Sequence, residues 1–569
     1  MTTKESGAKQ ADRKVRVSQL VYDTDPGTAV GTPPKMWGVG AAEKTYLANN
    51  FDPATRDDQL SYTPGRMAKN VFNQYEDNDY KTFCYYSDWG IGDPRYGEGP
   101  DEPPPTDYSK GGRGTDIMRL LGKTGTFDKI VVGFTAIVGD KGVNRDVINK
   151  AVINWGLSPA VDPENPTREE LDAAEIIALA LAMFIDPWND VAAFINCGFN
   201  GWKSNDYADL YDPAQAQGVL GALLKLQTAN PDLKLSLSLG GWSMSHAFYH
   251  IARDPEKTAR CIDSLAAIFT LWPMFNEIDI DWEYPSVPGN QPQAGDTWKG
   301  NDFDDDDPAY FAVFIQALKT KLAAIGKGSV KISIAVIADP VKLAKTNILL
   351  LIQAGLGGIN LMCYDFFGTP WAPKIQHHCN LYRSNPADIT ENSVHSAVQY
   401  LLGLGVPSKM IFIGYAGYSR NAQQAVLTSV SPLVGTYKQR PGTEDVPNST
   451  PGCFEPGITE WPGAMKHYLD LETKQPMNGF TLYTDKNADA DFLYNPVTQV
   501  FMSLDTPRTV KAKGEYVAKW NLGGLFSWMG DHDNGMLNNA ACEGVGRTVK
   551  TQVIDMTPFY YEGATTLQP

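Results

Sequence analysis

The chain lacks long apolar runs, and its basic residues are outnumbered by acidic ones. No stretch of the 569 residues approaches the length of a membrane span, so we expect no contact with a membrane. Lys and Arg total 49 against 66 Asp and Glu, which gives a formal net charge of -17. This balance argues against nucleic acid or an anionic surface as the main partner. A neutral substrate fits it better.

Cysteine and recognisable metal-binding patterns are also scarce. The seven cysteines are widely scattered and form no CxxC pair, which is typical of free buried thiols, although one bridge is an open alternative. The pair His377–His378 has no third ligand at a recognisable spacing, and Asp304–Asp307 lacks the spacing of a calcium loop. We interpret both as loops, the second a solvated one before a helix. We therefore expect no metal and no cofactor.

The N-terminal segment has neither an apolar core nor clear periodicity. Its first 20 residues lack the apolar stretch of a secretory signal, so we expect secretion by a non-classical route. Residues 1–75 are polar and rich in Gly, Pro, Asp and Asn. We interpret them as an N-terminal extension or a small accessory module.

From about residue 80, short apolar runs alternate with helical patterns. Eight runs suit buried parallel strands: Thr82–Tyr86, Lys129–Phe134, Leu233–Leu239, Ile278–Trp282, Val330–Ile337, Ile359–Tyr364, Met410–Tyr415 and Gly523–Trp528. Helical segments lie between several of them: Ala214–Ala229, Pro255–Leu271, Pro308–Ile325 and Ser393–Leu404. This α/β alternation predicts a (β/α)8 TIM barrel. An open doubly wound sheet is the alternative, but no GxGxxG follows the first strand.

Some connections are too long for simple turns. Residues 420–515, between predicted strands seven and eight, contain strand-like pieces such as Gly479–Tyr483 and predict an α+β insertion subdomain. The barrel would then occupy residues 76–419 and 516–550, followed by a tail at 551–569. Residues 138–212 include an apolar, helix-like run, Glu169–Phe184. Long loops at the carboxyl end of a barrel usually wall the active site.

The most informative segment is the predicted fourth strand. Asp279, Asp281 and Glu283 alternate there with apolar residues, so all three carboxylates point to one face. Crowded, buried carboxylates let one group keep its proton while a neighbour stays ionised, which is what general acid catalysis on a glycosidic oxygen needs. Pro285 then ends the strand and leaves Glu283 at its carboxyl end. The alternative, an edge strand with a solvated acidic face, fits poorly in the middle of a βα pattern.

This segment resembles the signature DGxDxDxE of family-18 glycoside hydrolases. The sequence differs at the first two positions, where Asn276 replaces Asp and Glu277 replaces Gly, and it keeps the last three acids. The resemblance implies retaining hydrolysis that uses the substrate's own acetamido group as nucleophile. It implies that Glu283 is the general acid and base, that Asp281 holds the acetamido nitrogen, and that Asp279 shares a proton behind it.

Further motifs resemble the same family in the correct order. Ser238–Trp242 (SLGGW) is similar to SxGG, which implies that Ser238 supports the carboxylates and that Trp242 stacks on sugar. Met362–Asp365 (MCYD) is similar to MxYD. This motif implies that Met362 lines the site and that Tyr364 and Asp365 bind the acetamido group.

Aromatic and basic candidates come from the other predicted strands and loops. Trp528, on the eighth strand, resembles the floor of the subsite for the reacting sugar, and Trp371 is a candidate stacking platform. Tyr418 and Arg420 follow the seventh strand. Tyr86, on the first strand, is predicted to face inward by parity with Phe134.

The resemblance as a whole implies a chitinase that acts on chitin or chito-oligosaccharides. Two alternatives are a sugar-binding barrel without catalysis and an endo-β-N-acetylglucosaminidase that cuts N-glycan cores. The intact Glu283 argues against the first, and the insertion at 420–515 favours chitin over the second. A chitinase with no signal peptide also fits a subunit of an insecticidal toxin complex, so other subunits of such a complex are candidate partners.

Overall fold

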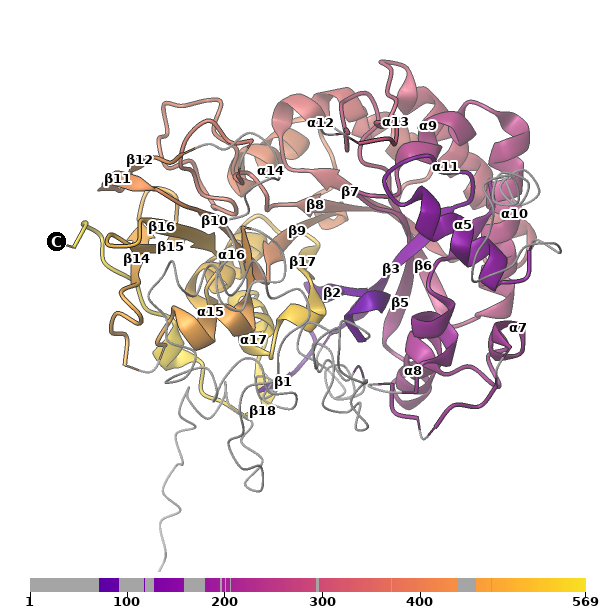
Figure 1. Cartoon of the computed structure of the whole chain (residues 1–569), viewed down its shortest axis with the longest axis horizontal. Coiled ribbons are helices and arrows are strands. Elements are labelled where there is room, and N and C mark those ends of the chain that lie inside the picture. Colours follow the sequence, from indigo (N-terminus) through magenta and orange to yellow (C-terminus); the bar gives the residue numbers. More distant parts are fainter. Residues whose placement is uncertain are drawn as a thin grey trace, which may run out of the picture.

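The computed structural model describes residues 71–91, 117, 127–157, 180–194, 197–199, 201–204, 206–292, 296–369, 371–438, 457–471 and 473–568. Within these residues the chain forms a barrel, on the right in Figure 1, and a mainly β insertion, on the left. Most of the predicted N-terminal extension, residues 1–70, lies outside the described residues. No helix in the described part combines the length and apolar character needed to cross a bilayer.

The barrel consists of eight parallel strands, as predicted. Its strands are β2 (Lys81–Ser87), β3 (Lys129–Ile137), β5 (Lys234–Gly240), β6 (Phe275–Asp281), β7 (Lys331–Ile337), β8 (Gly358–Met362), β9 (Ile411–Ala416) and β17 (Gly524–Trp528). They pair in the order β2-β17-β9-β8-β7-β6-β5-β3, and the pairing of β2 with β3 closes the ring. This closure excludes the open doubly wound sheet.

Helices cover the outside of the barrel. The four predicted helices correspond to α8 (Gly218–Ala229), α10 (Pro255–Leu271), α11 (Asp307–Ala324) and α14 (Val394–Gly403), and the others described around the barrel are α5 (Arg145–Asn154), α7 (Tyr207–Leu210), α9 (His246–Ala252), α12 (Pro340–Thr346), α13 (Ile348–Ala354), α16 (Pro507–Lys519) and α17 (Met536–Gly544). α10 begins at its predicted residue because Asp254 caps two backbone N–H groups and Pro255 follows at the first helical position.

The last residues of the predicted helical run Glu169–Phe184 form a strand. Residues 158–179 of this region lie outside the described residues, but β4 (Ala182–Phe184) pairs antiparallel with the end of β3. The prediction of helix is therefore wrong for this part of Glu169–Phe184. Short apolar runs fit either a buried helix or a buried strand, and here the open edge of β3 decides the outcome.

The acidic run Asp304–Asp307 is solvated only in part. Asp304, Asp305 and Asp306 are exposed, but Asp307 is fully buried at the start of α11. Its Oδ2 accepts hydrogen bonds from the backbone N–H groups of Ser286 and Asp304, and its other oxygen pairs with Arg253. The prediction of a wholly solvated loop is therefore wrong for Asp307, which fastens the loop after β6.

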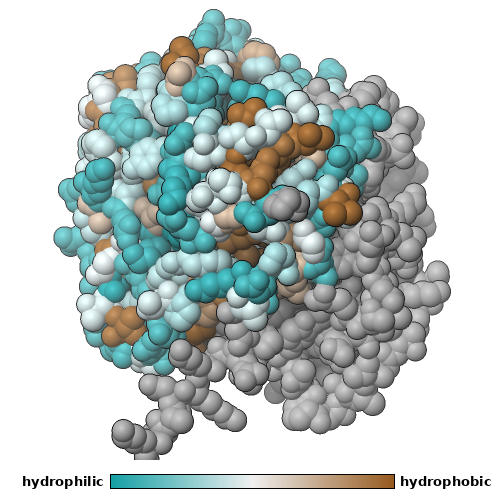
Figure 2. All heavy atoms as spheres, turned by 90° about the vertical axis from the view of Figure 1, so that its left-hand side faces the viewer, coloured by the Kyte–Doolittle hydropathy of each residue, from teal (hydrophilic) through white to brown (hydrophobic). Residues whose placement is uncertain are grey.

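The insertion between β9 and β17 is built on a five-stranded antiparallel sheet of order β13-β10-β16-β15-β14. Its strands are β10 (Tyr418–Ala422), β13 (Ile458–Glu460), β14 (Thr481–Asp485), β15 (Ala490–Asn495) and β16 (Val500–Leu504), accompanied by the hairpin β11 (Val426–Val430) and β12 (Leu433–Thr436) and by α15 (Trp461–His467). Figure 2 shows this side of the molecule, where apolar surface gathers in patches among polar residues.

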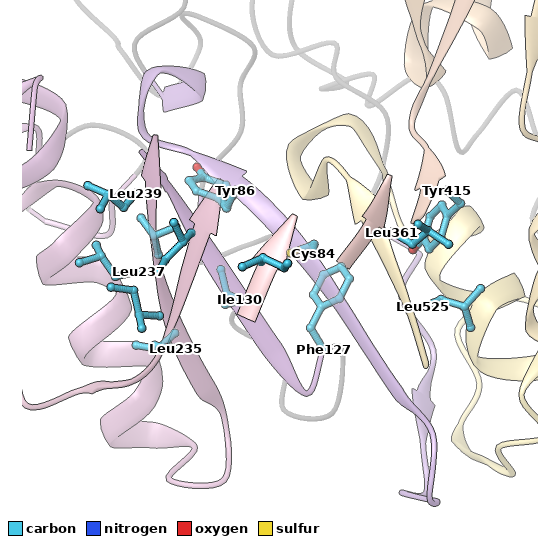
Figure 3. Packing of buried hydrophobic residues seen from close by; sticks show 14 of the residues in the cluster. Cys84, Tyr86, Phe127, Ile130, Leu235, Leu237, Leu239, Leu361, Tyr415 and Leu525 are labelled. Atoms are coloured by element: carbon cyan, nitrogen blue, oxygen red, sulfur yellow. The ribbon is translucent and has the colours of Figure 1, made fainter. Parts of the chain in front are cut away.

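Two apolar layers organise the barrel. One fills its interior and includes Phe83, Tyr85, Val131 and Phe526; the other lies between the strands and the helices. Figure 3 shows Tyr86 in the second layer, with Cys84, Ile130 and the leucines of β5. The prediction that Tyr86 faces the barrel interior is therefore wrong, and Tyr85 occupies that place.

A register shift explains the error at Tyr86. The pairing of β3 with β5 slips between Val132 and Thr135, so the alternation of side chains along β3 is broken there. Tyr86 pairs with Val132, before the shift, whereas Phe134 lies within it and turns toward Trp528. Parity taken from Phe134 therefore gives the opposite face for β2.

The start of the described chain pairs with the segment that leads into the C-terminal tail. β1 (Gln74–Tyr75) pairs with β18 (Val549–Thr551), and Asn73 accepts backbone hydrogen bonds from Val553 and Ile554. Further along, Ala564 bonds to Leu482 in the insertion. The C-terminal tail therefore touches both the start of the barrel and the insertion sheet.

A buried ion pair anchors the helix that returns from the insertion to the barrel. Lys513 on α16 contacts Asp505 at 2.6 Å, and each side chain is 1% exposed. Asp505 also accepts the N–H of Ala416 at the end of β9. The pair thus joins the insertion to the seventh barrel strand.

We expect Lys513→Met to lower the free energy of unfolding by about 3–5 kcal/mol, because the carboxylate of Asp505 would remain buried without its cation. A lower denaturant midpoint in tryptophan fluorescence would measure this. Lys511→Met on the same helix is the control, since its exposed pair with Glu515 should contribute no more than about 1 kcal/mol. Equal losses for the two variants would contradict the anchoring role.

Candidate active site

Three carboxyl groups, two on β6 and one just beyond its end, form the centre of the candidate site. Asp279, Asp281 and Glu283 are all buried, and their apolar neighbours Ile280 and Trp282 pack outward in the layer under the helices. The period-two alternation predicted from sequence therefore holds through the end of the strand. It places a column of carboxyl groups that leads from the barrel interior to its carboxyl end.

Asp279, the innermost of the three, is surrounded by hydrogen-bond donors from four other strands. Its Oδ2 accepts from Tyr85 at 2.7 Å and from Ser238 at 3.4 Å, and its Oδ1 accepts from Ser333 at 2.7 Å and Asn360 at 2.9 Å. Burial raises the pKa of Asp279, while the hydrogen bonds from Ser333 and Tyr85 oppose that rise.

Asp281 and Glu283 form a coupled pair. Burial raises the pKa of Asp281 well above its usual value, and the charges of Glu283 and Asp279 raise it further. Burial also raises the pKa of Glu283, to about 7, although hydrogen bonds from Tyr284 and Asp281 oppose the rise. The pair therefore holds a proton at neutral pH. Oδ1 of Asp281 has no hydrogen-bond partner among the described residues.

Two neighbouring loops hold the backbone of Glu283. The N–H of Glu283 donates to Oγ of Ser245 at 2.9 Å, and the amide of Asn301 donates to the Glu283 carbonyl at 3.1 Å. Gly240 (φ 104°) lets the chain after β5 approach closely, since a Cβ there would lie 2.6 Å from the carbonyl oxygen of Asp281. The SxGG motif is therefore needed for contact between β5 and β6.

The MxYD motif places its polar residues above the end of β8. Tyr364 is buried, and its ring contacts Tyr418 at 6.2 Å, while the side chain of Met362 is half-buried in the same layer. Asp365 accepts hydrogen bonds from Tyr418 at 2.8 Å and Arg420 at 2.7 Å. Burial alone would raise the pKa of Asp365, but Arg420 and His378 hold it below its usual value.

Aromatic rings continue the site outward. Trp528 at the end of β17 stacks with Phe134 at 5.8 Å, and Phe134 stacks with Trp89 at 6.1 Å. Trp242 and Trp371 are 51% and 53% exposed, and Arg420 lies 5.1 Å from the ring of Trp371. Exposed indoles of this kind offer flat apolar faces, which suits stacking against a sugar ring.

The structure brings twelve of the thirteen predicted site residues to the barrel interior or its carboxyl end, and Tyr86 is the exception. Sequence reasoning missed Tyr85, Ser333 and Asn360, which surround Asp279, and Ser245, Asn301 and Trp89 near the strand ends. Ser333 and Asn360 are polar residues within otherwise apolar strands, and this feature of the sequence could have identified them. Asn301 lies in a loop, and no pattern marked it.

The two departures from the family signature lie below the carboxyl pair. Asn276 has opposite parity to the carboxylates and hydrogen-bonds Leu235 and Met274. Glu277 forms an ion pair with Lys129 at 3.0 Å near the start of the barrel strands. Neither residue contacts Asp281 or Glu283 through a described hydrogen bond.

The predicted loop His377–His378 does not form a shared site. Both side chains are buried, but Nε2 of His377 faces Asp485 at 3.1 Å, and Nδ1 of His378 faces Asp365 at 3.8 Å. The six cysteines that the structure describes are all buried, and no disulfide joins any two of them.

A parallel barrel with a buried carboxylic acid and a carboxylate partner at the carboxyl end of one strand defines a glycoside hydrolase of the (β/α)8 class. The chain belongs to the glycosyl hydrolases family 18, whose family model matches residues 81–533.

Relatives of similar length support this assignment. The chain is 41% identical to Chitinase 1 of Yersinia entomophaga over 553 residues, which cover 96% of each protein, and 35% identical to Chitinase 2 of the same organism, covering 92% of this chain and 81% of that one. The chain superimposes with a TM-score of 0.78 and 41% identity on the chitinase Chi1 that was fitted into the Yersinia entomophaga toxin complex, covering 93% of this chain and 98% of Chi1. Chitinase ChiA74 from Bacillus thuringiensis, at 20% identity and a TM-score of 0.59 over 82% of this chain and 70% of that one, shares the fold.

We expect Tyr85→Phe to lower kcat/KM for a fluorogenic oligosaccharide by about tenfold, because Asp279 would lose a charge-assisted hydrogen bond. Tyr86→Phe is the matched control, since that side chain lies in the layer outside the strands, and its kcat/KM should stay near that of the wild type. A larger loss at Tyr86 than at Tyr85 would contradict the placement of the two rings.

Proposed function

We propose that the protein is a chitinase that cleaves β-1,4 linkages between N-acetylglucosamine units with retention of configuration. The observation that carries this proposal is the pair Asp281 and Glu283, buried and coupled at the end of β6 above the hydrogen-bonded Asp279. The likeness to Chitinase 1 over nearly the full length of both chains supports the substrate class.

In this proposal Glu283 is the general acid and then the general base. Its raised pKa, about 7, keeps the carboxyl protonated at the pH where the glycosidic oxygen needs a proton. The bonds from Ser245 and Asn301 fix its backbone, so the proton is delivered from a defined position. After the aglycone leaves, the carboxylate of Glu283 takes a proton from the incoming water.

Asp281 and Tyr364 act on the substrate's acetamido group. The acetamido oxygen attacks the anomeric carbon as the glycosidic bond breaks, and positive charge develops on the acetamido nitrogen. Asp281 accepts the N–H of that group, and its unpartnered Oδ1 is the available acceptor. Tyr364 orients the acetamido oxygen. Asp279 shares a proton with Asp281, so that Asp281 can become an acceptor for the acetamido N–H.

The aromatic and charged residues around the carboxyl pair hold the sugar chain. Trp528 forms the floor beneath the reacting sugar, and the exposed rings of Trp242 and Trp371 offer further platforms. Asp365, fixed as an ion by Arg420, accepts hydrogen bonds from sugar hydroxyls or the acetamido group. Met362 and Tyr418 complete the wall of the same subsite, with Ser238 supporting Asp279 from below.

We also propose that the protein acts outside the cell as part of a larger assembly. The chitinase Chi1, which is 41% identical to this chain and 98% of whose length is matched, was fitted into a toxin complex. Subunits of such a complex are therefore the proposed protein partners. The excess of acidic residues, with a net charge of -17, does not favour nucleic acid.

Glu283→Gln tests the proposed function. We expect the wild type to release a fluorophore from N-acetylglucosamine oligosaccharides of two and three sugars. The variant should lose at least the roughly 10²–10⁴-fold that general acid catalysis supplies. Glucose oligosaccharides of equal length should not be cleaved, because they lack the acetamido nucleophile.

Circular dichroism and retained binding of the oligosaccharide would show that Glu283→Gln still folds. A wild type that is inert on these substrates and on polymeric chitin would sink the proposal. Release of N-glycan cores by that same protein would then favour the endo-β-N-acetylglucosaminidase. Binding to chitin without any cleavage would favour the non-catalytic barrel.

The pKa of Glu283 predicts the alkaline limb of the pH profile. Because the active form carries the proton and the pKa is raised to about 7, kcat/KM should be sustained below this pH and fall about tenfold per pH unit above it. Initial rates between acidic and mildly alkaline pH would measure the limb. If kcat/KM instead began to fall near the ordinary pKa of a glutamate, while tryptophan fluorescence showed the fold unchanged across the pH range, the assignment of the acid to Glu283 would be contradicted.

A further inference from the structure

A second cluster of chemically capable side chains lies behind the site, where α9 meets the loop that follows β6. His246 and His250 come from α9, and Asp302 comes from the loop before α11. One ligand atom from each lies within 4.8 Å of the others, and within the described residues no other three His, Cys, Asp or Glu side chains meet in this way. Nε2 of His250 is 3.1 Å from Oδ2 of Asp302.

The spacing and the donor types suit a first-row transition metal ion. His246 and His250 are four residues apart, so their rings lie on one face of α9, with centroids 5.1 Å apart. Two imidazoles and a carboxylate are ligands that Zn²⁺ and Co²⁺ accept, with water completing the shell. Ligand atoms around tetrahedral zinc are about 3.4 Å apart. The side chains of His250 and Asp302, 43% and 55% exposed, have room to close to that distance.

His246 supplies an independent observation. The residue is only 3% exposed, and its Nε2 is buried without a hydrogen-bond partner among the described residues. Its other ring nitrogen, Nδ1, receives only a long contact of 3.3 Å from the N–H of Lys141. A buried ring nitrogen without a partner is unfavourable. A metal ion on Nε2 would satisfy it, with the ring proton moved to Nδ1 at the expense of the long Lys141 contact.

Local charge limits the affinity. The positive charges of Lys141 and Lys299 act on His246, and Asp302 is the one acidic ligand of the cluster. A site with a single carboxylate beside two ammonium groups is poor for the hard cations Ca²⁺ and Mg²⁺, which need several oxygen ligands. Imidazole ligands retain affinity for zinc-type ions in such surroundings.

Each side of the cluster adjoins a residue that holds the candidate acid. Ser245, which accepts the N–H of Glu283, immediately precedes His246, and Asn301, which donates to the carbonyl of Glu283, immediately precedes Asp302. An ion bound by the three side chains would therefore join the two segments that fix the backbone of Glu283.

We propose that His246, His250 and Asp302 form a binding site for one zinc-type divalent cation, which ties the start of α9 to the loop after β6. The site itself is independent of the proposed function, whereas any effect of the ion on hydrolysis rests on that function. Little in the sequence pointed to this cluster, because the third ligand lies in a loop that is remote in sequence from the helix carrying the two histidines.

The test is titration of Co²⁺ into untagged, full-length protein that has been freed of metal with a chelator. We expect the visible absorption bands of cobalt in a low-symmetry nitrogen and oxygen site, saturating at one ion per chain and displaced by Zn²⁺ but not by Mg²⁺. His250→Ala and Asp302→Asn should each weaken Co²⁺ binding at least about tenfold, which is the low end of what even outer-sphere changes cost. Both residues are exposed, so neither change should prevent folding.

Asp305→Asn is the matched control, because Asp305 is an exposed acid of the same loop outside the cluster. This variant should bind Co²⁺ like the wild type, and a given concentration of Zn²⁺ should raise the Tm of both by more than it raises that of His250→Ala. Absent bands, or bands unchanged by His250→Ala, would overturn the site. Neither readout uses hydrolysis, so an inert enzyme with intact cobalt binding overturns the proposed function alone, and an active enzyme without cobalt binding overturns the site alone.

Discussion

The burial of three carboxyl groups along β6 and just beyond its end is the constraint on which the rest of the structure depends. Removing carboxylates from water and placing them side by side is unfavourable unless donors or shared protons compensate. For Asp279 the compensation comes from β2, β5, β7 and β8, each of which contributes one side chain. These bonds form only when the strands keep one register, so the hydrogen bonding of Asp279 depends on the closure of the barrel.

The outer part of the site depends on segments that are remote in sequence. Arg420 on β10 and the neighbouring His378 keep Asp365 ionised, and Tyr418 on β10 donates a hydrogen bond to it. β10 is also the second strand in the order of the insertion sheet. That sheet is in turn fastened to β9 through Asp505 and Lys513. The insertion therefore takes part in the site itself, because β10 supplies a charged contact and a hydrogen bond to Asp365, just after the end of β8.

Much of the scaffold could be predicted from local pattern. The eight strands and four helices follow from hydrophobic periodicity and from caps such as Asp254–Pro255, and the alternation in β6 gave the common face of its three acids. Prediction from hydrophobic pattern failed where the same pattern fits two different structures. Ala182–Phe184 is an apolar run that pairs as a strand because β3 offers an edge, and Tyr86 was assigned to the wrong face because a register shift in β3 reverses the parity taken from Phe134.

The sequence by itself determined which residues alternate along the strand of β6 and which acids stand in a column, because these depend on neighbours two to four residues away. Only the tertiary structure decided which donors meet Asp279, that Glu283 is held by Ser245 and Asn301, and that Asp302 approaches two histidines of α9. The pKa of Glu283 belongs to the second group, because desolvation and coupling to Asp281 arise only when the barrel closes around them.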